Sequence, residues 1–135
     1  MRVAVVYLSD KNNRTLTEIA EALAKGIETQ GHQVECINVN ESGDKKLLIF
    51  NYIVLGTEQS SAFGKISEKI THYLNQAGSM TGKKSSAFVI KNTFGTNKAL
   101  LNLMAAMEKE GMLIKNSLIF SQKDEAFEAG KKLHI

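Results

Sequence analysis

The chain has no proline, no tryptophan and a single cysteine, Cys36, among its 135 residues. One cysteine excludes an intrachain disulfide and a thiolate metal cluster, and its place in an expected strand favours a buried, inert thiol. Loops without proline depend on glycine, asparagine and packing for their shape. No apolar run approaches the roughly 20 residues of a membrane span. A strand that starts at the first residues leaves no room for a signal peptide, so we expect a cytoplasmic protein without a membrane segment.

Strong charge of one sign is also missing. The chain carries 17 basic and 14 acidic residues, a net charge of +3, and its paired lysines fall at the ends of expected elements rather than in one stripe. This pattern argues against nucleic-acid binding. The three histidines lie far apart without metal-ligand spacing, so no metal site is expected. The sequence has no Gly-x-Ser-x-Gly nucleophile elbow, no Walker loop and no Gly-x-Gly-x-x-Gly motif after the first strand. It therefore gives no support for a hydrolase, an NTPase or a dinucleotide-dependent dehydrogenase.

Apolar runs typical of strands alternate along the chain with segments that carry apolar residues at helical spacing. Strands are expected at residues 3–8, 33–39, 52–55, 86–90 and 112–120. Helices are expected at residues 16–30, from residue 66 to near Gly78, at 99–110 and at 124–133, with one or two helical turns at 45–50. Such alternation predicts an α/β domain of residues 1–135, with a five-stranded parallel sheet of order 2-1-3-4-5 and helices on both faces.

Three loops should meet at the ligand crevice of such a sheet, beside its first and third strands. They comprise residues 9–15, 57–64 and 91–97, and all three are rich in hydroxyl and amide side chains. The first loop leads into a helix, whose unpaired N–H groups and dipole attract anions. This arrangement predicts a phosphate-bearing, nucleotide-like ligand. Helix capping is the competing interpretation, because Thr15 with Glu18 forms a possible capping box, whereas the cations Lys11 and Arg14 favour the anion site.

Several segments carry a resemblance to a known family. They are residues 3–7 with the polar loop, Tyr52-Ile53-Val54-Leu55-Gly56-Thr57, Ala62-Phe63-Gly64-Lys65-Ile66, Gly82-Lys83-Lys84 before residues 86–90, and Asn92-Thr93-Phe94-Gly95. In these segments, and over nearly its whole length, the chain resembles the flavodoxin-like family. The resemblance implies a three-layer sandwich that binds FMN and passes electrons between redox partner proteins, with no catalytic side chain.

The resemblance also implies where the cofactor contacts the chain. The phosphate would lie on the first loop, and the isoalloxazine ring between the second and the third. The candidate phosphate-binding residues are Ser9, Lys11, Asn12, Asn13, Arg14 and Thr15. The candidate ring-binding residues are Thr57, Glu58, Gln59, Ser60 and Phe63 on one side and Asn92, Thr93, Phe94 and Gly95 on the other.

The chain departs from the family pattern in these same loops. Asparagine stands where the first loop usually has glycine, although it tolerates left-handed backbone better than most residues. Glu58 and its neighbours replace a proline and an aromatic residue, which leaves Phe63 and Phe94 to stack on a ring. For Phe63 the competing role, a lid on the following helix, is slightly favoured. Two alternatives therefore stay open: a flavodoxin-like domain that has lost FMN and binds or regulates a partner, and a small flavin-dependent quinone reductase.

Overall fold

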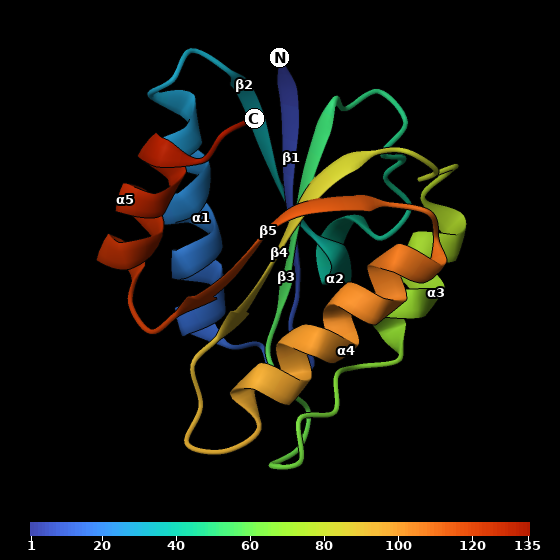
Figure 1. The fold of residues 1–135 in the computed structure, drawn as a ribbon, viewed down its shortest axis with the longest axis vertical. Helices are drawn as coiled ribbons and strands as arrows, with labels where there is room; N and C mark the ends of the chain where they lie inside the picture. The colour runs from blue at the N-terminus through green and yellow to red at the C-terminus, as the bar shows by residue number, and fades with distance from the viewer.

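The computed structural model describes residues 1–135 as five strands and five helices (Figure 1). The strands are β1 (Arg2–Leu8), β2 (Gln33–Asn38), β3 (Tyr52–Thr57), β4 (Lys84–Ile90) and β5 (Leu113–Phe120). The helices are α1 (Arg14–Glu28), α2 (Val39–Ser42), α3 (Lys69–Gln76), α4 (Thr96–Lys109) and α5 (Lys123–Lys132).

The strands form one parallel sheet of order β2-β1-β3-β4-β5, as the sequence predicted. From β1 the chain first adds β2 on one side and then returns to add β3 on the other. At such a reversal the loops that follow β1 and β3 leave the same edge of the sheet in opposite directions, which opens the crevice where ligands of this architecture bind. The order of the strands thus brings the first and second predicted loops together.

Two apolar cores cover the two faces of the sheet, which makes the three-layer sandwich seen in Figure 1. Successive side chains of a strand point to opposite faces. In β1, Val3 and Val5 pack with α1 and α5, whereas Ala4 and Val6 pack with α3 and α4. Every residue of β3 is buried, as expected for a central strand covered on both sides.

Helices α1 and α5 approach each other closely through two glycines. A Cβ atom added at Gly26 would lie 2.3 Å from the carbonyl oxygen of Phe127, and one added at Gly130 would lie 2.5 Å from that of Leu23. The side-chain amide of Gln30 ties the same helices together by donating to the carbonyls of Gly130 (2.7 Å) and Leu133 (2.9 Å). Backbone packs directly on backbone at this glycine seam, which we define as Gly26 and Gly130.

Some predicted boundaries were wrong. Residues 45–50 are not helical, and the helical turns come earlier, in α2, which takes Val39 out of the predicted second strand. Helix α3 begins at Lys69 rather than at residue 66, because Ile66 forms an isolated antiparallel bridge with Gln59.

Cys36 was expected to be buried, but its side chain is exposed on the edge strand β2. Desolvation, followed by the charges of Glu21 and Glu28, raises the pKa of its thiol to about 12. The thiol therefore stays protonated at neutral pH, as the sequence interpretation of an inert cysteine requires. On the opposite face, burial raises the pKa of Tyr73 to about 12.

The two ends of the chain lie at the same edge of the sheet, opposite the predicted loops (Figure 1). Met1 and Ile135 line one shallow hollow there, together with residues 48–52 and 81–84. None of the helices is long and apolar enough to cross a membrane.

Candidate functional site

The first predicted loop is organised around the hydroxyl group of Ser9. Ser9 follows the last residue of β1 and is 5% exposed. Its Oγ accepts hydrogen bonds from the backbone N–H groups of Asn13 (2.8 Å) and Lys11 (3.3 Å). The same Oγ donates to Oε1 of Glu58 at 2.8 Å. Ser9 thus shapes the turn into α1 and joins the first loop to the second.

Glu58 directs its carboxylate into the first loop. Its Oε1 accepts from the Ser9 hydroxyl and also lies 3.3 Å from the backbone nitrogen of Lys11, which donates to it. The residue is 6% exposed, and its other oxygen, Oε2, is buried without any hydrogen-bond partner. A negatively charged side chain of the protein therefore lies where the sequence predicted a negatively charged ligand.

The start of α1 differs from the predicted capping box. The N-cap is Asn13, whose side-chain oxygen accepts from the backbone N–H of Leu16 at 3.2 Å. Thr15 lies inside the helix, and Glu18 pairs instead with Arg14 at 3.4 Å. The capping-box prediction was wrong because Asn12, at φ 52°, turns the chain so that the helix begins two residues earlier than expected. The cap leaves other N–H groups of the first turn without intrahelical partners.

Cations surround this loop at its surface. Lys11 is exposed, and the side chain of Arg14 is 91% exposed despite its contact with Glu18. Lys69, at the start of α3, lies 3.4 Å from the carboxylate of Asp10. Sequence reasoning missed Asp10 and Lys69 as partners, since nothing in their local pattern indicates that α3 starts beside the first loop.

Asn40 is a second residue that sequence reasoning missed. Its side-chain amide donates to the carbonyl oxygen of Ser9 and so braces the first loop from α2. Its position just after an expected strand was the available signal, because parallel strands bring their carboxyl ends to one edge.

The second and third loops bind directly to each other. The side-chain amide of Gln59 donates to the carbonyls of Ser61 (2.8 Å) and Phe94 (2.6 Å), while its Oε1 is buried without a partner. Gly64 and Gly95 meet at the same contact, since a Cβ atom at Gly95 would lie 2.7 Å from the backbone nitrogen of Gly64. Gly95 has a φ of 82°, a left-handed backbone conformation that favours glycine, and it directly precedes α4.

The remaining predicted residues divide into those turned inward and those facing solvent. Thr57 is 1% exposed, and its hydroxyl donates to the carbonyl of Leu8 at 2.7 Å. It therefore joins the carboxyl ends of β3 and β1. Phe63 is 77% exposed, which excludes the lid on the following helix, and Phe94 is 71% exposed. The other exposed candidates are Asn12, Thr15, Ser60, Asn92 and Thr93. Two unburied phenylalanines thus stand on loops that the Gln59 amide links.

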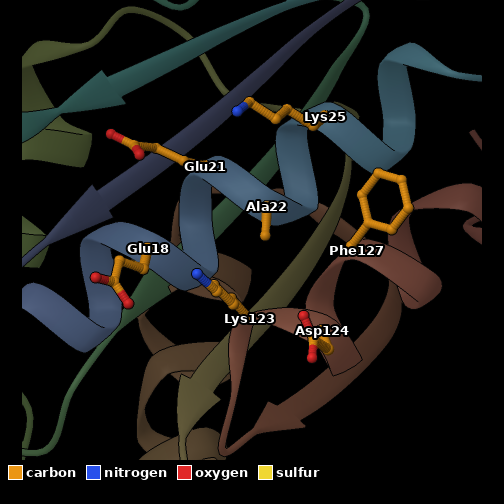
Figure 2. Close-up of a pocket in the computed structure, with 7 residues that line it drawn as sticks. All are labelled: Glu18, Glu21, Ala22, Lys25, Lys123, Asp124 and Phe127. Atoms are coloured by element: carbon orange, nitrogen blue, oxygen red, sulfur yellow. The ribbon is translucent and has the colours of Figure 1, made fainter.

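The main hollows of the surface are not lined by residues of the first two loops. One lies between α1 and α5. Lys25 and Ala22 of α1 and Phe127 and Asp124 of α5 are among the residues that line it (Figure 2), and none of the predicted residues does. Another lies beside the third loop and includes Thr93 and Gly95.

Comparisons with known proteins bear on the fold. No protein-family model matches the chain, and no curated protein matches it. Solved structures do match over almost its full length. Oxidised flavodoxin 1 from Bacillus cereus is 17% identical, with a TM-score of 0.75 over 98% of this chain and 93% of that one. A flavodoxin from the domain Archaea is 20% identical, with a TM-score of 0.71 over the same shares. Two-electron reduced flavodoxin from Megasphaera elsdenii is 17% identical, with a TM-score of 0.65 over 97% of this chain and 99% of that one. With its strand order, its two covered faces and these matches, the chain has the flavodoxin-like fold.

Proposed function

We propose that this chain is an FMN-binding electron-transfer protein, with the flavin phosphate on the first loop. The observation that carries the proposal is the donor set gathered at the start of α1, at the point where the strand order reverses. It combines first-turn N–H groups with the hydroxyls of Ser9 and Thr15 and the cations Lys11 and Arg14. Phosphate accepts hydrogen bonds from all of these group types, and a helix N-terminus favours its charge. In its donor chemistry the loop fits a phosphate, and Glu58 is the group that a phosphate has to displace.

The same proposal puts the isoalloxazine ring against the second and third loops. Phe63 and Phe94 supply exposed aromatic faces there, and the backbones of Ser60, Thr93 and Gly95 lie on the same two loops. FMN, when bound, supplies the electron-transfer chemistry, while the protein supplies binding and orientation. The chain's own residues hold the phosphate and cover one side of the ring. Its partners would be redox proteins that reach the ring from the open side.

A second candidate function is a binding or regulatory module that works without flavin. The buried carboxylate of Glu58 favours it, because this group already takes the hydrogen bonds of Ser9 and Lys11. The lack of any tryptophan or tyrosine in the second and third loops points in the same direction. In this case the exposed phenylalanines would contact a protein partner.

Titration of the purified protein into FMN, followed by flavin fluorescence, tests the first proposal. Riboflavin, which lacks the phosphate, is the control ligand. Saturable binding of FMN well above that of riboflavin supports a phosphate site, and the double variant Lys11→Gln/Arg14→Gln should then weaken FMN but not riboflavin. Absence of FMN binding at micromolar protein would reject the carrier and favour the flavin-free module.

A further inference from the structure

We propose that Glu58 is an internal anion that occupies the phosphate position of the first loop, so that an oxyanion enters only by displacing its carboxylate. This inference rests on the proposed anion site and adds a device that controls it. Two observations support it independently. The donors of the loop, the Ser9 hydroxyl at 2.8 Å and the Lys11 N–H at 3.3 Å, point at Oε1 of Glu58. Its Oε2 is buried without a hydrogen-bond partner. Such an atom costs free energy, so a purely structural role for the side chain does not explain it.

The carboxylate and a phosphate cannot share this position. Both are anions and both need the same donors, and little water reaches the group to screen them, because Glu58 is 6% exposed. Their binding is therefore mutually exclusive. An oxyanion gains the hydrogen bonds only after the carboxylate has lost them. The free energy of this loss lowers the measured affinity of the protein for the oxyanion.

The second loop allows the carboxylate to leave. Glu58 is the first residue after β3, and the exposed Ser60 follows two residues later. Rotation of the Glu58 side chain would move its charge into solvent, where the exposed cations Lys11 and Lys69 lie beside the first loop. The exchange would also break the hydrogen bond between Ser9 and Glu58 that joins the first and second loops. Binding of an oxyanion would therefore loosen the second loop, which carries Phe63, from the first.

Three variants separate this role from a structural one. Glu58→Gln keeps the size and the hydrogen bond of the side chain but removes its charge, and Glu58→Ser empties the position. Glu68→Gln is the matched control, because it makes the same change of charge at a nearby residue. Glu68 is exposed at the start of α3, and its side chain makes no capping hydrogen bond. Urea unfolding of each variant establishes that it is folded before binding is measured.

The affinity for FMN is the first measurement, and inorganic phosphate is the second probe. Phosphate binding is followed by the backbone amide NMR signals of Lys11 and Asn13, which does not depend on a flavin. We expect Glu58→Gln and Glu58→Ser to bind FMN at least about tenfold more tightly than the natural chain, since both remove the negative charge that competes with an oxyanion at these donors. Glu68→Gln should match the natural chain.

The outcomes for Glu58 and for the FMN proposal are distinguishable. Equal FMN affinity of the natural chain and both Glu58 variants overturns the inference and leaves FMN binding standing. If no protein binds FMN, the carrier proposal fails. Phosphate binding then tests the role of Glu58. Shifts of the Lys11 and Asn13 signals in the Glu58 variants that are absent from the natural chain and from Glu68→Gln support the internal anion. Signals that are unchanged in every variant, or that shift equally in all proteins, reject it.

Discussion

Replacement of Gly26 by alanine sets two physical effects against each other. Alanine in the middle of α1 is favoured over glycine by about 1 kcal/mol of helix propensity. In the folded protein, however, the new Cβ would lie 2.3 Å from the Phe127 carbonyl oxygen and 2.9 Å from the Cα of Gly130. Both are backbone atoms, so relief requires α5 to move by about 1 Å, and overpacking of this kind costs about 3 kcal/mol at its upper range. We expect Gly26→Ala to lower the free energy of unfolding by about 2 kcal/mol.

Urea unfolding followed by circular dichroism measures this change. The control is a pair at the exposed position 21 of the same helix, Glu21→Ala and Glu21→Gly, whose difference gives the propensity contribution in α1 itself. A Gly26→Ala variant that is as stable as the natural chain, or more stable, would refute the close approach of the two helices at the glycine seam.

Three further predictions concern single groups. Asn13→Ala should cost about 1 kcal/mol of unfolding free energy, because the cap of the Leu16 N–H is lost; unchanged urea unfolding contradicts this. The raised pKa of Tyr73 means that its phenol holds the proton more tightly when folded, so its contribution to stability should be level below about pH 10 and fall from there toward pH 12; Tyr73→Phe should lose less stability than the natural chain over this range in alkaline unfolding, and an equal loss contradicts this. Cys36, although exposed, should react with a disulfide reagent at pH 8 far more slowly than free glutathione, and an equal rate would argue against its raised pKa.

The sequence predicted the fold well because its signals are long and repeated. Strand runs such as residues 52–55 and the helical spacing in α1 and α4 each persist over several residues, and their alternation dictates a parallel sheet. Short segments were predicted less well. The helical turn of α2 and the late start of α3 are set by tertiary contacts, such as the bridge between Gln59 and Ile66, that no local pattern reveals.

The sequence predicted which loops lie beside each other but not how their side chains are paired. The sequence indicated that Ser9 and Glu58 belong to neighbouring loops, since both follow parallel strands. It could not indicate that one would donate a hydrogen bond to the other, because this depends on side-chain direction across the reversal of the strand order. The same limit applies to Gln59, whose side-chain amide links the second and third loops, a contact that no local pattern indicates.

Met1 and Ile135 line one hollow, so the chain is suited to circular permutation, in which these two ends are joined and new ends are made elsewhere. A short flexible linker between these residues would join the ends without crossing the sheet, and new ends could then be opened in an exposed loop. A circular permutant opened between Ala62 and Phe63 would keep both apolar cores and all four pairs of neighbouring strands. It would leave Glu58 joined to β3 but separate the second loop from α3, so that the hydrogen bonds of Glu58 to the first loop could be studied without the constraint of the connection to α3.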